Sequence, residues 1–327
     1  MSFADILGQG RALSFLRRAI ETGRLPHALL FTGPKGVGRF RTAVTVAKAL
    51  NCLGGAKGDC CDQCPACVKI EKGIHPDVHV LAPEGASLKI DQIRGLTQEA
   101  TRTPYEGRRK AFILDQAETM TEQAQNALLK TLEEPPGVTV LTLIAPDSSA
   151  LLSTIASRCS QIRFAPLPES TIAACLQEQG CDQGEAHVLA GLAGGSLGRA
   201  QELRSIPLQE VHHLVEQAFA LPPGKTLPIL ELTDRVVRKK ETLPLFLEVL
   251  LAWCRDLTVS RLTDRDALLV YRNREAALRR LSEQLGTSQL VAMYQMVKQT
   301  LDGVGRYANP RLSLEVMLLK FRDLQAA

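Results

Sequence analysis

A glycine-rich segment near the start of the chain has the spacing of a loop that binds phosphate groups. Gly33, Gly36 and Gly38 follow a short apolar run and match the glycine frame of the P-loop, G-x-x-x-x-G-K-[ST]. An active P-loop continues with a lysine that reaches the β- and γ-phosphates and with a hydroxyl residue that binds Mg²⁺. Here those residues are Arg39 and Phe40. Because a phenyl ring cannot bind Mg²⁺ and a guanidinium does not replace a compact ammonium, we expect weak nucleotide binding or none.

A second motif of nucleotide hydrolysis is also incomplete. Asp115 follows the apolar run 110–114 and has the position of the acidic residue that holds Mg²⁺ through water. Active ATPases of this type place a glutamate directly after it, whereas this chain has Gln116, whose neutral amide cannot accept a proton from water. Glu118 is offset by two residues, and we interpret it as a solvated acid at a helix start. Phe40 and Gln116 together predict a chain that does not hydrolyse ATP.

Four cysteines have the spacing of a structural zinc site. Cys52, Cys61, Cys64 and Cys67 form the pattern C-x8-C-x2-C-x2-C, and four thiolates close a tetrahedral site around one ion. Cys60 stands beside Cys61 and is the alternative ligand at that position. A redox pair needs only two cysteines, so we predict bound zinc with a structural role.

The elements that must position these residues alternate between strands and helices. Such alternation predicts a parallel sheet with helices on both faces, which is an α/β fold. Expected strands are 28–31, 78–82, 110–114, 138–145 and 160–164, and helices among them are 7–22, 38–50 and 121–132. After 165–168 the pattern changes to short helices, and after Pro207 to helices only.

Length and composition limit the possible classes of protein. The 327 residues are enough for two or three domains, and 45% apolar with 23% charged residues is typical of soluble globular chains. No apolar run reaches the roughly 18 residues that cross a bilayer, and the first residues do not form a signal peptide, so we expect a cytoplasmic protein. In that reducing compartment the nine cysteines should be thiols or metal ligands. A net charge of +4 is compatible with nucleic-acid contact without indicating it.

Several longer strings carry a resemblance to a known family. They are 126–136 (NALLKTLEEPP), 157–159 (SRC), 75–77 (HPD), the cysteine segment and 309–315 (NPRLSLE). Along essentially its whole length the chain resembles the AAA+ clamp-loader subunits of bacterial DNA polymerase III, in particular those of the delta-prime type.

The resemblance implies an architecture and a set of partners. It implies a RecA-like AAA+ domain over 1–165 with the zinc module at 52–67 inserted, a helical lid over 166–206 and an all-helical collar domain over 207–327. Arg158 of the Ser-Arg-Cys string would act as an arginine finger on ATP bound by a neighbouring subunit. The implied partners are gamma/tau-type ATPases, a clamp-opening delta-type subunit, and through the complex the sliding clamp and primed DNA. In this role the subunit supports clamp loading by the polymerase holoenzyme and bears no ATPase activity of its own.

Two other functions stay open at this point. One is an active AAA+ ATPase that tolerates Arg39 and Phe40. The chain departs further from active relatives, however, with Ala145-Pro146 at a position where they carry a polar residue and Gly198 where they carry an arginine. The other is a free-standing zinc protein that binds DNA. Four basic residues could contact DNA phosphates: Arg102, Arg108, Arg109 and Lys110. We favour the alternative that they lie on a solvated loop.

Overall fold

The computed structural model describes residues 1–55, 57–239, 241–263, 268–304 and 309–326. Position 56 of the cysteine segment therefore lies outside the described residues, as do short stretches of the expected C-terminal domain. The chain divides into two compact units. One comprises Met1–Thr171 with Gly195–Arg199, and the other comprises Ile172–Gly194 with Ala200–Ala327.

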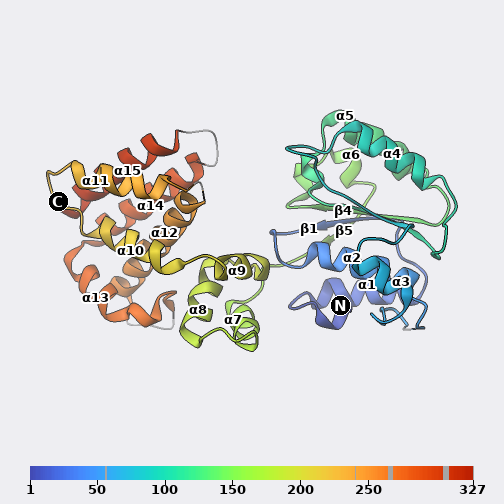
Figure 1. Cartoon of the computed structure of the whole chain (residues 1–327), viewed down its shortest axis with the longest axis horizontal. Coiled ribbons are helices and arrows are strands. Elements are labelled where there is room, and N and C mark those ends of the chain that lie inside the picture. The colour runs from blue at the N-terminus through green and yellow to red at the C-terminus, as the bar shows by residue number, and fades with distance from the viewer. Residues whose placement is uncertain (56, 240, 264–267, 305–308, 327) are drawn as a thin grey trace. The chain divides into compact units, whose positions relative to one another are not determined.

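The first unit is built on five strands in the described residues (Figure 1). Its elements are η1 (Phe3–Asp5), α1 (Gly10–Glu21), β1 (Ala28–Thr32), α2 (Arg39–Asn51), α3 (Pro65–Glu71), β2 (Val78–Leu81), α4 (Ile90–Ala100), β3 (Lys110–Leu114), η2 (Ala117–Thr119), α5 (Glu122–Glu133), β4 (Thr139–Ala145), η3 (Ser148–Ala150), α6 (Ser153–Ala156) and β5 (Ser160–Arg163). The predicted strands agree with β1 to β5 to within one residue at each end.

The strands form one sheet in the order β2-β3-β4-β1-β5, and every paired neighbour is parallel. The α/β fold class predicted from the sequence is therefore confirmed. Strand β1 lies between β4 and β5, with Leu30 opposite Leu143 and Phe31 opposite Ile162. All seven residues of β4 are buried, as expected for a parallel strand that helices cover on both faces.

Alternate residues of the strands bury against two different helical layers. Leu30 and its same-side neighbours pack with α4, α5 and α6, whereas Leu29 and Phe31 pack with α1 and α2. Figure 1 shows these layers on opposite faces of the sheet. Because β3, β4 and β1 are neighbouring parallel strands, their carboxyl ends meet along one edge of the sheet. That edge carries the glycine loop after β1 and the acidic motif after β3.

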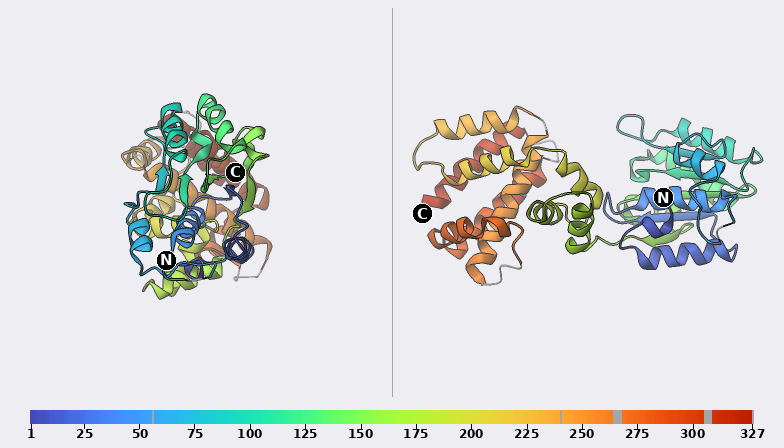
Figure 2. Two further views of the ribbon diagram at one scale, coloured as in Figure 1. Left: turned by 90° about the vertical axis from the view of Figure 1, so that its right-hand side faces the viewer. Right: turned by 60° about the horizontal axis from the view of Figure 1, so that its bottom comes forward.

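The remaining elements, from Glu169 on, are helices only in the part of the chain that the structure describes (Figure 2). They are α7 (Glu169–Glu178), α8 (Gln183–Leu192), α9 (Leu197–Arg204), α10 (Leu208–Phe219), α11 (Leu227–Val237), α12 (Thr242–Leu262), η5 (Arg272–Arg274), α13 (Glu275–Gln284), α14 (Thr287–Val304) and α15 (Pro310–Ala326). The core of the second unit gathers around α12, where Trp253 stacks on Phe219 with ring centroids 5.8 Å apart. None of the described helices combines the length and apolarity needed to cross a membrane.

Candidate functional site

The glycine loop has the strand–loop–helix setting of a phosphate-binding loop. It leaves β1 at Thr32 and enters α2 at Arg39, and its three glycines all have positive φ. At Gly33, with φ of 140°, an added Cβ would lie 2.3 Å from the carbonyl oxygen of Phe164. Only glycine allows this backbone to pass so close to the chain that follows β5. The frame found in the sequence is thus required by the local conformation.

The top of the loop is in contact with the segment Gly195–Arg199 of the same unit. The Gly198 N–H donates to the Gly36 carbonyl oxygen at 3.1 Å. An added Cβ on Gly198 would lie 3.1 Å from the Gly36 Cα, and one on Gly36 would lie 2.2 Å from Ser196 Oγ. Glycine at position 198, where active relatives are expected to carry arginine, therefore allows two backbones to touch. The loop is closed against its own chain at this point.

The side chain of Arg39 is buried and forms a hydrogen bond within the first unit. Its side chain is 9% exposed, and its Nη1 donates to the carbonyl oxygen of Ala145 at the end of β4. Burial lowers the pKa of Arg39, and the nearby carboxylates of Glu118 and Asp115 oppose that shift. The guanidinium remains a cation at neutral pH. It lies at the end of β4, close to the carboxylates of the acidic motif, while the neighbouring Phe40 is 40% exposed.

The acidic motif follows β3 through a tight turn. Asp115 Oδ1 accepts the Gln116 N–H at 3.0 Å, and Gln116 adopts a left-handed conformation with φ of 53°. The interpretation of Glu118 as a solvated acid is wrong, because its side chain is half-buried and its Oε2 is buried without a hydrogen-bond partner among the described residues. The sequence analysis did not predict the short helix η2. This helix turns Glu118 back toward the sheet edge and Arg39.

We expect Arg39→Ala to lower the free energy of unfolding by about 1–3 kcal/mol, because it leaves the buried Ala145 carbonyl and the adjacent carboxylates without their cation. Urea denaturation followed by circular dichroism measures this change. The matched control is Lys35→Ala on the exposed part of the same loop, which should stay within about 0.5 kcal/mol of the parent. Equal stability of both variants would show that Arg39 has no structural role.

The four predicted cysteine ligands lie together. The Sγ atoms of Cys52, Cys61, Cys64 and Cys67 are all within 4.8 Å of one another. Four thiolates held about 2.3 Å from one zinc ion would be about 3.8 Å apart, so a small contraction brings this set to tetrahedral geometry. Backbone N–H groups point at the sulfurs, with the Cys61 N–H on Cys52 Sγ at 3.4 Å and the Cys64 N–H on Cys61 Sγ at 3.3 Å.

This donor set fits a zinc ion. Partial burial opposes ionisation of Cys64, but N–H groups of Cys67 and Leu53 lower the pKa of its thiol to about 6. Burial, together with the contact to Cys64, instead raises the pKa of Cys67, so in this set Cys64 is the thiol that ionises first. A thiolate is the form that binds metal. At Gly54 an added Cβ would lie 2.7 Å from Cys61 Sγ, so the glycine lets the loop fold over the sulfurs. The four residues present are therefore able to hold zinc, which would fix the loop to the start of α3.

Cys60 is buried beside Cys52 and Cys67, but its sulfur is not among the four that lie together. Its Sγ lies 3.6 Å from the Met1 carbonyl oxygen and 3.6 Å from Asp62 Oδ1. Burial, together with the Asp62 carboxylate, raises the pKa of Cys60 to about 12. Of the two neighbours that the spacing left as alternatives, Cys61 is the one whose sulfur faces the other three.

A buried lysine, which the sequence analysis did not identify, ties the cysteine segment to the sheet domain. Lys48 of α2 is fully buried, and its Nζ pairs with Asp62 at 2.5 Å and with Glu71 at 2.6 Å. The amino group of Met1 also pairs with Asp62, at 2.6 Å. The available signal was a lysine that directly follows the apolar pair Val46 and Ala47 in α2. Such a charge is buried only when it is paired.

Arg158 lies just before β5, on the loop that follows α6. Its Nη2 forms an ion pair with Glu133 Oε1 at 2.7 Å, and its Nη1 donates to the Thr154 carbonyl oxygen at 3.0 Å. The side chain remains 38% exposed. The structure thus places Arg158 at the surface beside the end of α5, bound to residues of α5 and α6 and not to the glycine loop.

The basic cluster before β3 is only partly available to a ligand. Lys110 is 2% exposed and pairs with Glu99 at 2.5 Å, so the expectation that it faces solvent or DNA is wrong. Arg102 pairs with the same carboxylate at 3.0 Å. The buried side chain of Asp77 accepts three successive N–H groups from residues 105–107, which fixes the loop. This arrangement explains the His-Pro-Asp string as a loop anchor.

Comparisons with known proteins identify the family to which the sequence is similar. Residues 8–168 match the family model described as DNA polymerase III, delta subunit, and residues 212–325 match the model for DNA polymerase III subunits gamma and tau domain III. The chain is 33% identical to the DNA polymerase III subunit delta' of Bacillus subtilis, over 89% of this chain and 90% of that protein.

A second delta' subunit is similar over nearly the same share of the chain. The delta' subunit of Pseudomonas aeruginosa is 33% identical over 91% of this chain and 92% of its own length. A DNA polymerase III gamma subunit-related protein of Thermotoga maritima superposes with a TM-score of 0.48 at 22% identity, covering 96% of this chain and 99% of that one.

Proposed function

This chain belongs to the family of DNA polymerase III delta' subunits, and from that premise we propose that it serves in a clamp loader without hydrolysing ATP itself. The observation that carries the proposal is similarity to delta' subunits along about nine tenths of both chains. In this role the protein is a stationary member of an ATP-driven assembly that loads the sliding clamp onto primed DNA. It has gamma/tau-type ATPases and a delta-type subunit as partners.

The state of the glycine loop supports the absence of hydrolysis. Phe40 and Gln116 remove the Mg²⁺ ligand and the group that activates water. The structure adds that Arg39 donates to the Ala145 carbonyl, and that Gly198 closes on Gly36. An active ATPase with an unusual loop would need Arg39 free to reach phosphate, so the contact with Ala145 favours the inactive form.

We assign Arg158 the role of an arginine finger that acts on ATP bound by a neighbouring subunit. Its guanidinium is 38% exposed, at the end of a buried helix–sheet layer that can hold it still. A guanidinium supplied from a second subunit neutralises charge that develops on the γ-phosphate. The cysteine cluster is separate from this chemistry and stabilises the loop between α2 and α3.

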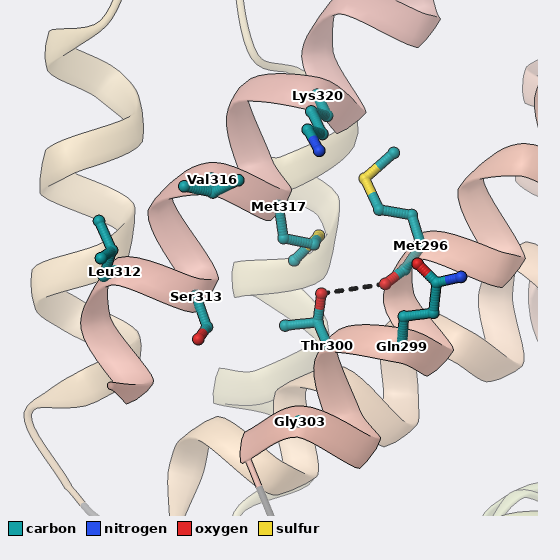
Figure 3. Close-up of a pocket in the computed structure, with 9 residues that line it drawn as sticks. All are labelled: Met296, Gln299, Thr300, Gly303, Leu312, Ser313, Val316, Met317 and Lys320. Carbon is teal, nitrogen blue, oxygen red and sulfur yellow. Dashed lines mark hydrogen bonds between the residues drawn. The ribbon is translucent and has the colours of Figure 1, made fainter. Parts of the chain in front are cut away.

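The helical part of the chain supports contacts with other subunits. Helices α14 and α15 frame an open groove that includes Met296, Met317 and the exposed side chains of Leu312 and Val316 (Figure 3). A groove of this kind suits the apolar face of a helix from another protein. We therefore propose 207–327 as the collar domain.

The two remaining domain assignments rest on the same premise. We propose residues 1–165 as the RecA-like AAA+ domain and 166–206 as the lid. Within the proposed lid, Gly195–Arg199 belongs to the first unit through its contact with the glycine loop, whereas Ile172–Gly194 belongs to the second.

Reconstitution tests the proposed function. The purified chain is mixed with gamma/tau-type ATPase and delta-type subunits, and the mixture is analysed by size exclusion and by loading of the clamp onto primed DNA. We expect a stable complex that contains this chain and a loss of clamp loading when the chain is omitted. A complex that forms and loads clamps equally well without it would contradict the proposal.

The isolated chain should show no ATP turnover above background. The physical reason is the loss of both the Mg²⁺ ligand at Phe40 and the general base at Gln116. Phosphate release with Mg²⁺ and ATP measures this, with gamma/tau-type ATPase as the positive control. Turnover that Asp115→Ala abolishes would show that the chain is an active ATPase.

A further inference from the structure

We propose that Glu133 is the positioning residue for Arg158. The carboxylate at the end of α5 holds the guanidinium in the orientation from which it reaches a neighbouring subunit's ATP. This inference rests on the proposed function, because it specifies how the finger of that function is held.

Residues of α5 and α6 contact two different nitrogens of the Arg158 guanidinium. Glu133 Oε1 lies 2.7 Å from Nη2, and the Thr154 carbonyl oxygen accepts from Nη1 at 3.0 Å. Because the guanidinium is planar, two contacts at separate nitrogens fix both its position and the tilt of its plane. A single contact would leave the plane free to rotate.

Glu133 and Arg158 are both attached to well-packed parts of the first unit. Glu133 is the last residue of α5, which is anchored by the buried side chains of Leu128 and Leu132. Arg158 stands between the buried Ile155 and Cys159 of the same core cluster. The ion pair therefore fixes the guanidinium of Arg158 relative to the well-packed helix α5.

The contacts with Glu133 and Thr154 leave other N–H donors of Arg158 available to a ligand. A guanidinium has five N–H donors, and the two contacts use one donor from each of two nitrogens. Arg158 is 38% exposed and the Glu133 side chain 50% exposed, so the pair stays open to solvent. An anion from another subunit can bind the remaining donors while Glu133 keeps its hold.

An ion pair as exposed as this one contributes little to folding stability. Its effect on the reaction rate is larger, because a misplaced catalytic group slows the reaction even when the protein stays folded. Loss of Glu133 should therefore lower the turnover that depends on Arg158 and leave the melting temperature nearly unchanged.

The chain offers a matched control in the adjacent residue. Glu134 is an exposed carboxylate of the same string, and it forms no ion pair within the described part of the chain. Glu134→Ala removes the same charge one residue away. It separates an effect on Arg158 from a general change of surface charge at this end of α5.

The experiment uses the reconstituted complex with gamma/tau-type ATPase, delta-type subunit, clamp and primed DNA. Five forms of this chain are compared: the parent, Glu133→Ala, Glu134→Ala, Arg158→Ala and the double variant Glu133→Ala/Arg158→Ala. The readouts are kcat and KM for ATP, with melting temperature as the test of folding. Glu133→Gln is added because it keeps a hydrogen-bond acceptor at the same place.

We expect Glu133→Ala to lower the Arg158-dependent part of kcat by about 3- to 10-fold, with KM within about 2-fold of the parent. Glu133→Gln should recover part of this loss, and Glu134→Ala should match the parent. The double variant should be no worse than Arg158→Ala, because a positioning residue has no effect once the residue that it positions is gone.

The outcomes separate this inference from the proposed function. If Arg158→Ala itself has no effect, the finger assignment fails and the inference fails with it. If Arg158→Ala lowers kcat but Glu133→Ala does not, the finger stands and the positioning role is overturned. A further loss in the double variant would also overturn it, since Glu133 would then act independently of Arg158.

Discussion

Replacing Arg158 with alanine is expected to lower ATP turnover at one neighbouring site of the assembled loader by at least about 10²-fold, because the γ-phosphate loses its charge partner in the transition state. Total ATPase and clamp loading should fall only in part, since the other sites keep their own fingers. The half-exposed side chain makes few core contacts, so folding and assembly should be nearly unchanged. Steady-state phosphate release and clamp loading by the reconstituted complex measure the effect.

Two control variants sharpen this prediction. Arg158→Lys should restore little activity, because an ammonium lacks the planar, two-pronged donor geometry of a guanidinium. Arg163→Ala removes another exposed arginine five residues away on β5 and should leave turnover at the parent rate. An Arg158→Ala complex that loads clamps as fast as the parent would show that Arg158 is only a surface residue.

Replacing Cys61 with serine is expected to remove the metal and to destabilise the first unit. Purified without chelator, the parent should contain one zinc per chain, and Cys61→Ser should contain much less. A structural zinc site contributes several kcal/mol to folding, and a loss of about 3 kcal/mol lowers the melting temperature of a unit of this size by roughly 6–12 °C. Elemental analysis and thermal unfolding measure the two effects.

The neighbouring cysteine provides the control. Cys60→Ser changes the same thiol one residue earlier, but that sulfur faces Met1 and Asp62 and not the cluster. Its zinc content should equal that of the parent. Loss of metal in Cys60→Ser with retention in Cys61→Ser would mean that the two neighbours exchange roles. A folded parent without metal would contradict the zinc assignment altogether.

Much of the sheet domain could be predicted from the chain alone. Runs such as 28–31 and 138–145 are apolar, short and bounded by turn residues, and strands buried on both faces require that pattern. The glycine frame was also recognisable, because Gly33 and Gly36 occupy conformations that other residues rarely adopt. These features depend on residues close together in the sequence, so local patterns are sufficient to identify them.

Spacing was less informative where two neighbouring residues of one type compete. The cysteine pattern predicted a four-thiolate site but left Cys60 and Cys61 as alternatives. Adjacent side chains in a loop point in different directions, and the direction depends on the path of the whole segment. The structure turns Cys61 toward the other sulfurs and Cys60 toward Met1 and Asp62.

Local sequence thus determined the glycine frame, the residues Phe40 and Gln116 in the two nucleotide motifs, the four-cysteine spacing and the order of the strands. The tertiary structure decided that Arg39 is bound to Ala145 and that Arg158 pairs with Glu133. It also decided that Lys48 is buried. Each of these depends on a partner that is distant in sequence, or on a face of a helix that packing covers. Burial and pairing of a charge are set by such neighbours, which no pattern in the residues around it describes.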